Sequence, residues 1–342
     1  MARPLGIGMK RRALLAAALL PSFAPPLLTS RARAQTPDGQ RRLAVLLPYG
    51  EADAKSQGHL ALLREELGKL GWRDGRNLKV EVRWTGGDAG KTTTLAREAV
   101  ASRPDAILAR STGVTAAVVR ETRAIPTVFV VVSDPVGDGF VASMARPGGN
   151  VTGFTNVEAS LCSKWVQLLT EIDPRVRRIA VLYGPKTSAG GGTYYMRLAE
   201  EAAASSVIQV VALPVQDAVD AGQGIDAFAK EASGALLVTP DATTTRLRSM
   251  IVAAAARTRL SAIYPFREFA EEGGLVSYGT DVADQYRKAA VYLDRLLRGA
   301  KPADLPVEQP SRFELVLNLA TAKALDLAIP LSILARADEV IE

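Results

Sequence analysis

Three hydrophobic segments occur twice in this chain, in the same order and at similar spacing. Arg41–Leu46, Pro104–Leu108 and Ile125–Phe129 are echoed by Arg177–Leu182, Ser233–Leu237 and Leu260–Tyr264. In each half, the second segment follows the first by about 60 residues and the third follows the second by about 20. One such match would mean little, but three in order indicate two similar structural units. The repeat therefore predicts two lobes of the same kind rather than one large domain.

The stretches between these segments have helical periodicity. Leucines recur at positions 60, 63, 67 and 70, and Gly71 then ends the pattern. In the first half we expect strands at Leu43–Leu47, Leu78–Trp84, Ala106–Ala109 and Thr127–Val132, and helices at Leu95–Val100 and Thr115–Thr122. Strands that alternate with helices form parallel sheets, so the sequence predicts an α/β fold with two doubly wound, Rossmann-like lobes.

The boundary between the lobes is predicted from a structure-breaking segment and from the length of the tail. Arg146–Asn150 contains proline and two glycines, and a strand is expected directly after it. The tail beyond the second set of echoes holds a strand, a long amphipathic helix, a proline-rich loop and a last strand-like run, which two simple units would not need. We therefore expect the chain to cross back between lobes, with residues 41–154 and 280–310 in the first lobe and 156–277 and 313–342 in the second.

The excess of positive charge lies in the N-terminal leader. The whole chain has 42 Lys and Arg against 36 Asp and Glu, a net charge of +6. Residues 1–34 hold six of the basic residues and no acid, so the remainder holds 42 − 6 = 36 basic residues against 36 acidic ones. A basic surface for nucleic acid is thereby disfavoured, and we expect no nucleic-acid partner.

The leader, residues 1–34, has the three parts of an export signal. Lys10–Arg12 is the positive region, Ala13–Leu20 begins an apolar region, and Ala32-Arg33-Ala34 supplies the small residues that a signal peptidase requires. The sequence predicts export and cleavage after Ala34. A membrane anchor is disfavoured because prolines interrupt a short apolar run. Export through the Sec or the twin-arginine route remains open, because two arginines are adjacent.

The residues that most often build catalytic or metal sites are scarce. Cys162 is the only cysteine and His59 the only histidine, so a disulfide within the chain and a histidine-rich metal site are excluded. Gly90-Lys91-Thr92 resembles the end of a phosphate-binding loop, but Thr85 stands where that motif needs glycine. We therefore expect no metal, no cofactor and no enzyme activity.

A ligand cleft is predicted where the strands end, because ligands of open α/β sheets bind beyond the carboxyl ends of the strands. Ser111 and Thr112 stand at such an end and open a helix. Their hydroxyls and the free N–H groups of the first turn suit a carboxylate. Ordinary capping of the helix by either residue is the alternative reading.

Two acidic and three aromatic residues stand at other strand ends and complete the expected ligand site. Asp241 is the first candidate partner for an ammonium group and Asp134 the second, although both lie beside proline and suit turns equally well. Tyr49, Tyr183 and Tyr278 are expected to line an apolar wall.

Sequence motifs throughout the mature chain carry a family resemblance. They are Leu67–Trp72, Gly75–Leu78, Ile125–Phe129, Asp134–Gly137, Ala145–Gly153, Arg267–Phe269, Gly273–Leu275, Ser277–Gly279, Ala300–Pro310 and Ala335–Ile341. In these motifs the chain resembles the ABC-transporter substrate-binding protein family, whose relatives include tryptophan- and tyrosine-binding lipoproteins. The resemblance implies a type I periplasmic-binding fold with two lobes, a ligand cleft and three hinge crossings.

The resemblance also implies partners and a mode of action. It implies delivery of a small ligand, such as an aromatic or other amino acid, to a permease in the inner membrane and its ATPase. No cysteine lies near the cleavage point, so the lipobox cysteine of the lipoprotein relatives is missing, which suits a free protein in the periplasm. We expect this protein to be a monomer. Hinge bending near 154–156, 277–280 and 309–313 would close the cleft. A sensory module for a membrane receptor and an uncharacterised hydrolase remain the alternatives.

Overall fold

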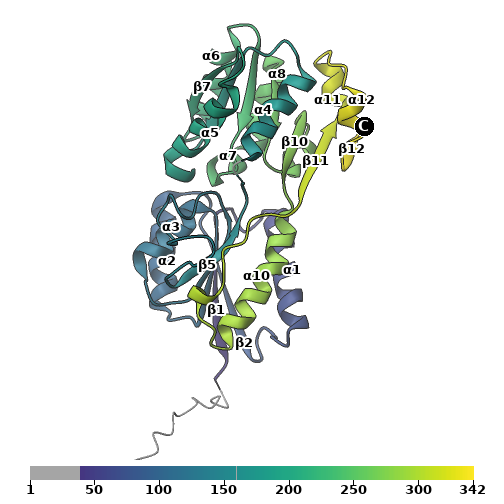
Figure 1. Cartoon of the computed structure of the whole chain (residues 1–342). Coiled ribbons are helices and arrows are strands. Elements are labelled where there is room, and N and C mark those ends of the chain that lie inside the picture. The colour runs from purple at the N-terminus through teal and green to yellow at the C-terminus, as the bar shows by residue number, and fades with distance from the viewer. Residues whose placement is uncertain (1–38, 159) are drawn as a thin grey trace, which may run out of the picture. The chain divides into compact units, whose positions relative to one another are not determined.

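The computed structural model describes residues 39–158 and 160–342. The predicted leader and its cleavage site lie outside these residues. From Gln40 to Glu342 the chain forms one compact unit that contains two sheets (Figure 1). We call each sheet with its covering helices a lobe. None of the described helices is long and apolar enough to cross a membrane.

The first lobe is built on five parallel strands in the order β2-β1-β3-β4-β5. The strands are β1 (Arg41–Leu47), β2 (Leu78–Trp84), β3 (Ala106–Arg110), β4 (Thr127–Val132) and β5 (Val151–Thr155). The helices are α1 (Ala54–Lys69), α2 (Ala89–Ala101), α3 (Thr112–Glu121), α10 (Val282–Leu297) and the short 3-10 helix η2 (Pro302–Asp304).

Both faces of this sheet are buried, which explains the unbroken apolar runs of its strands. Leu43, Val45 and Leu47 of β1 face a cluster that includes Leu63 of α1 and Leu293 of α10. Ala44 and Leu46 face the opposite cluster, formed with α2 and α3. Because side chains alternate along a strand, one hydrophobic segment thus supplies two cores.

The second lobe has seven strands in the order β12-β11-β10-β9-β8-β6-β7, and β11 is antiparallel to β10. The strands are β6 (Arg178–Tyr183), β7 (Gln209–Pro214), β8 (Gly234–Val238), β9 (Ser261–Tyr264), β10 (Val276–Thr280), β11 (Phe313–Asn318) and β12 (Glu339–Ile341). The helices are α4 (Ser160–Ile172), α5 (Thr193–Ala203), α6 (Ala218–Ala229), α7 (Ala242–Arg246), α8 (Arg248–Thr258), α9 (Arg267–Glu271), α11 (Leu319–Ala324), α12 (Leu331–Leu334) and the 3-10 turn η1 (Ala189–Gly192).

The repeat seen in the sequence is a repeat of topology. The order β2-β1-β3-β4-β5 of the first sheet returns as β7-β6-β8-β9-β10 in the second. Each of the three echoed segments lies on corresponding strands: β1 and β6, β3 and β8, β4 and β9. The prediction of two α/β lobes with parallel sheets is confirmed.

The chain passes between the lobes three times. It leaves the first lobe after β5, returns from β10 into α10, and leaves again between η2 and β11 (Figure 1). The crossings are hydrogen-bonded to one another: the N–H of Thr155 donates to the carbonyl of Glu308 at 2.9 Å, and the Gln285 amide donates to the carbonyl of Thr155 at 3.1 Å. The connection is therefore a small ordered assembly rather than three loose linkers.

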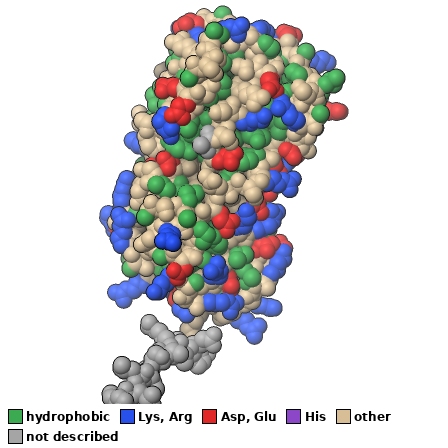
Figure 2. Space-filling view, viewed as in Figure 1, with side chains coloured by type: hydrophobic (Ala, Val, Ile, Leu, Met, Phe, Trp, Pro, Cys, Tyr) green, Lys and Arg blue, Asp and Glu red, His purple; other side chains and the backbone are tan. Residues whose placement is uncertain are grey.

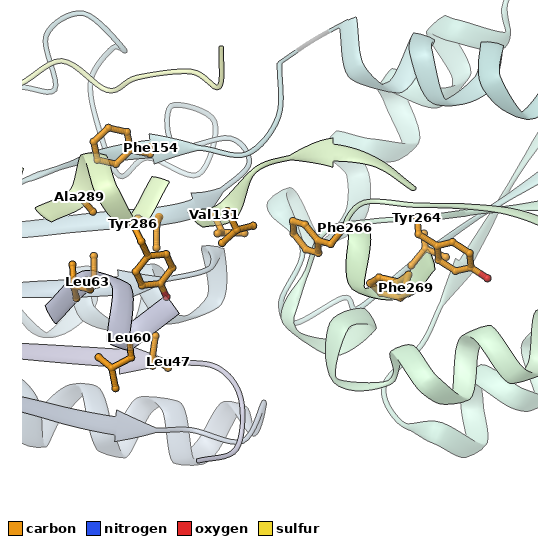
Figure 3. Close-up of a cluster of buried hydrophobic side chains, with 14 of the residues drawn as sticks. Leu47, Leu60, Leu63, Val131, Phe154, Tyr264, Phe266, Phe269, Tyr286 and Ala289 are labelled. Carbon is orange, nitrogen blue, oxygen red and sulfur yellow. The ribbon is translucent and has the colours of Figure 1, made fainter. Parts of the chain in front are cut away.

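An apolar contact also joins the lobes beside these crossings. Val131 of β4 and Phe266, which precedes α9, are both buried and belong to one hydrophobic cluster. Figure 3 shows Val131 and Phe266 facing each other. Tyr286 and Phe154, in the first lobe, lie on the side of Val131 that is away from Phe266. Val131 has a φ of +58°, which is rare for a β-branched residue, at the point where the pairing of β4 with β5 shifts register.

Candidate functional site

A cavity lies between the lobes, at the carboxyl ends of strands from both sheets. Pro48, Thr85 and Ser111 line it from the first lobe, and Lys186, Thr187 and Ala242 line it from the second. The lobes approach closely here: a Cβ placed on Gly113 would lie 3.7 Å from the carbonyl oxygen of Lys186. The cavity is thus a gap between two surfaces in contact, in the position that the strand-end rule predicts.

The start of α3 forms one wall of this cavity. Ser111 has a φ of +83°, so the chain turns sharply from β3 into α3. Backbone strain of this kind tends to gather at functional sites. The Ser111 hydroxyl accepts only a long hydrogen bond, 3.4 Å, from the N–H of Val114. The first N–H groups of a helix have no acceptor within the helix, so this wall offers several donors to an anionic group.

Thr85, at the end of β2, is a second polar group of the cavity wall. Its side chain is fully buried, and its hydroxyl has no hydrogen-bond partner among the described residues. A buried polar group without a partner is costly, of the order of 1–3 kcal/mol. A bound molecule that supplied an acceptor or donor here would remove that cost.

The basic side chains around the cavity make no ion pairs with other described residues. Arg120 of α3 and Lys186 line the main cavity. Two larger hollows adjoin it, and they are additionally lined by Arg246 in one case and by Arg123 and Thr112 in the other. Figure 2 shows Lys and Arg side chains along the edge of the first lobe that α2 and α3 form.

Asp241, the first candidate for an ammonium group, is engaged within the protein. Its carboxylate accepts hydrogen bonds from the N–H groups of Thr243, Thr244 and Gly184 and from the hydroxyls of Thr187 and Thr239, at 2.8–3.0 Å. Burial raises the pKa of Asp241, although all five donors favour its ionised form. These contacts fix the start of α7 to the loop after β6 and occupy the lone pairs that an ammonium would need.

Asp134, the second candidate, lies in a turn of the first lobe. One carboxylate oxygen accepts from the N–H of Gly137 at 2.8 Å, as in an Asx turn. The neighbouring Asp138 has one oxygen bonded to the N–H of Gly190, in the other lobe, at 3.1 Å. The second oxygen of Asp138 is buried without a partner, and burial raises the pKa of this group.

The three predicted tyrosines are dispersed over both lobes. The Tyr49 ring lies 4.8 Å from the guanidinium carbon of Arg110. The Tyr183 ring packs on Gly192, where a Cβ would come within 2.1 Å of it. Tyr278 stacks on Phe313 with ring centroids 5.6 Å apart. All three rings thus pack against neighbouring residues. Of the other predicted site residues, Ser111 lines the main cavity and Thr112 lines the hollow beside it.

Arg110, at the end of β3, is buried beside His59 and the rings of Tyr49 and Tyr286. Its guanidinium lies 3.1 Å from Nδ1 of His59, and the His59 ring stacks on Tyr286 at 5.1 Å. Burial lowers the pKa of His59 to about 3, and the charges of Arg110 and Lys55 lower it further, against a smaller opposite effect of Asp53. His59 is thus neutral and accepts from Arg110.

This contact predicts an acid-sensitive stability. A histidine with a lowered pKa is protonated in the unfolded chain below pH 6.5 but not in the folded one, so stability falls as the pH falls from 6.5 towards 3. We expect the free energy of unfolding to drop by about 1–2 kcal/mol more between pH 7 and pH 5 in the unmodified protein than in His59→Gln. Urea unfolding at both pH values measures this, and equal drops would contradict it.

Several residues of the cleft were not predicted from the sequence. Thr85 follows β2, and the strand-end rule would have found it had β2 been included with β1, β3 and β4. Arg120 lies on an exposed helical face, where a cation ordinarily indicates only a solvated surface. Lys186 and Asp138 follow strand ends by several residues, and nothing in their spacing shows that they line the same hollow from different lobes.

The only histidine and the only cysteine do not form a pair. His59 lies in the first lobe, and Cys162 is fully buried in the core of the second, where burial raises the pKa of its thiol to about 12. Among residues 39–158 and 160–342, no three His, Cys, Asp or Glu side chains gather in an arrangement that could hold a metal ion.

Two similar α/β lobes, three crossings and a polar cavity at the strand ends define a two-lobed ligand-binding protein. The chain belongs to the family described as ABC transporter substrate binding protein, whose model matches residues 50–341. It is 25% identical over 285 residues to a tyrosine-binding protein of Clostridioides difficile strain R20291, covering 83% of this chain and 80% of the relative. The resemblance inferred from sequence motifs is thereby confirmed.

Solved structures support the same fold. A conserved domain protein from Vibrio cholerae superposes with a TM-score of 0.82 at 27% identity, over 88% of this chain and 100% of that one. An ABC domain in complex with L-Trp from Streptococcus pneumonia superposes with a TM-score of 0.78 at 24% identity, over 89% of this chain and 100% of that one. The type I periplasmic-binding fold is confirmed.

Proposed function

We propose that this chain is the periplasmic solute-binding component of an ABC importer and that it holds a small carboxylated molecule between its lobes. The observation that carries the proposal is the cavity at the start of α3, which residues of both lobes line. Family membership supports it, as do a relative named for tyrosine binding and a neighbour in complex with L-Trp. The protein would act as a monomer, without nucleic acid or catalysis.

The carboxylate would bind at the first turn of α3. Ser111 lies at the turn itself, Thr112 begins the helix, and Thr85 offers an unpartnered hydroxyl from the neighbouring strand end. A carboxylate there gains from the positive end of the helix dipole, by roughly 0.3–1 kcal/mol, and from each hydrogen bond made. Asp241 has a different role in this arrangement: it holds the opposite wall in place through its five internal contacts.

Ligand binding would be coupled to hinge motion. The lobes already touch through Asp138 and Gly190, and through the ion pairs of Arg248 with Asp53 at 3.4 Å and Lys55 with Glu271 at 2.8 Å. Such contacts on the rim can hold the cleft shut around a ligand and break when the crossings bend. Loaded protein, with its lobes together, would then be the form that the permease and its ATPase receive.

We expect ligand to reduce the radius of gyration of the protein. Mass spectrometry of small molecules released from protein purified without refolding identifies the ligand, calorimetry measures its affinity, and small-angle scattering compares the loaded and stripped forms. An equal radius in both forms would contradict hinge closure, provided that the stripped form is shown to be open. Loss of uptake of the same molecule in cells lacking the gene tests the importer role, and unchanged uptake would argue for sensing instead.

A further inference from the structure

We propose that the ligand is an organic acid anion, a carboxylate that carries no balancing ammonium group. The inference rests on the proposed function and concerns the charge of the molecule held in the same cleft. It follows from the charges that line the cleft, from one unpartnered hydroxyl and from the internal engagement of Asp241.

The main cavity has positive side chains and no negative ones. Arg120 and Lys186 line it, together with the donors of the α3 turn. None of the described residues that line this cavity is Asp or Glu. An ammonium group placed here would lose its hydration without gaining a countercharge, which is unfavourable in a desolvated site.

The hollows beside the cavity do not reverse this balance. They add Arg123 and Arg246 on the positive side, and Asp88 and Asp138 on the negative side. Four cations against two carboxylates leave a net charge of 4 − 2 = +2 across the cleft. A zwitterion, which has no net charge, would leave that excess in place, whereas an anion offsets it.

Both of these carboxylates already bind backbone N–H groups. One oxygen of Asp88 accepts from the N–H of Lys91 at 2.6 Å and caps α2. Asp138 accepts from Gly190 across the lobes. The second oxygen of Asp138 is buried without a partner among the described residues, and the second oxygen of the exposed Asp88 accepts no hydrogen bond from them, so an ammonium group would have to bind at one of these two atoms if the ligand had one.

Thr85 offers the cavity a hydroxyl that a carboxylate could use. It is fully buried in the cavity wall, and its hydroxyl has no partner among the described residues. A hydroxyl can donate to a carboxylate oxygen, and a hydrogen bond to a charged acceptor is stronger than one between neutral groups. The hydroxyl, the cations and the start of α3 can thus all bind a carboxylate.

Calorimetry with matched pairs tests the charge of the ligand. Each pair consists of an amino acid and the same acid without the amino group: L-tryptophan and 3-(indol-3-yl)propanoate, L-tyrosine and 3-(4-hydroxyphenyl)propanoate, L-leucine and 4-methylpentanoate, L-glutamate and glutarate. In the pair that fits the cavity, we expect the acid without the amino group to bind at least ten-fold more tightly. Equal or tighter binding of the amino acid would overturn the inference and leave the proposed function intact.

If no member of the panel binds, the inference is overturned as well. The molecule released from the purified protein then decides the proposed function on its own: a bound small molecule supports it, and its absence together with unchanged uptake in cells lacking the gene opposes it. The two failures are thereby distinguished.

Three variants locate the effect in the cleft. For the acid that binds, Arg120→Gln should weaken binding roughly three-fold or more, while Asp138→Asn, which removes a like charge but keeps an oxygen that can accept from the N–H of Gly190, should strengthen it. Lys301→Gln removes the same charge from an exposed site outside these hollows and serves as the control. For the amino acid of the same pair, weaker binding to Asp138→Asn than to the unmodified protein, with the thermal midpoint unchanged, would show that an ammonium group is recognised and would overturn the inference.

Discussion

Asp241→Ala should lower the free energy of unfolding by about 3 kcal/mol or more. The carboxylate accepts five hydrogen bonds from buried donors, and alanine would leave those donors without an acceptor. The loss would fall on two elements at once, because the same oxygens cap α7 and hold the N–H of Gly184 after β6. Urea unfolding measures the change as a lower midpoint with an unaltered slope.

Asp217→Ala is the matched control for this prediction. Asp217 also caps a helix, accepting from the N–H groups of Val219 and Asp220, but it is exposed and makes no hydrogen bond to a described residue outside its own turn. Its loss should cost about 1 kcal/mol. If the two variants were equally stable, Asp241 would be an ordinary cap, and its carboxylate would again be free to serve the ligand.

Gly279→Ala should also destabilise the protein by roughly 3 kcal/mol or more. Gly279 lies in β10, directly before the crossing into α10, and a Cβ there would come within 1.7 Å of the carbonyl oxygen of Pro265. Because the obstacle is backbone rather than a flexible side chain, β10 or the segment after β9 would have to move. Thermal or urea unfolding measures the loss.

Gly58→Ala provides the comparison. Gly58 is exposed in α1, and no atom lies within 4 Å of the position that its Cβ would take. Alanine is the better helix former, so this variant should be more stable by about 0.5–1 kcal/mol. A Gly279→Ala protein as stable as the unmodified one would mean that β10 and β9 can separate at no cost, contrary to the packing described.

The fold could be predicted in large part because its strands are buried on both faces. Leu43–Leu47 and its echo in the second half are continuous apolar runs, and such runs identify parallel strands reliably. The ends of helices are harder to predict. The helix expected from Thr115 begins three residues earlier, at Thr112, because Ser111 caps it. The short strand β12 was missed because three residues carry too little pattern.

The candidate site was predictable only where backbone position decides the outcome. Ser111 lies in the cleft because the end of β3 and the start of α3 must lie there. Asp241 also follows a strand end, but its orientation depends on Thr187 and Thr239, which place hydroxyls within 2.9 Å of its carboxylate. Sequence spacing does not reveal whether a side chain turns outward to the cleft or inward to such donors.

Helix α10 has a consequence for the order in which the chain can fold during synthesis. It packs on the first sheet through Tyr286, Ala289 and Leu293, yet it follows most of the second lobe in the chain. One face of the first sheet therefore stays partly uncovered until about residue 297 has emerged from the ribosome, although its own strands end at Thr155. Domains that are contiguous in sequence fold as they are made. The first lobe cannot be completed before most of the second has been made, so we expect a nascent chain to stay incompletely folded for longer, which would suit the proposed periplasmic role.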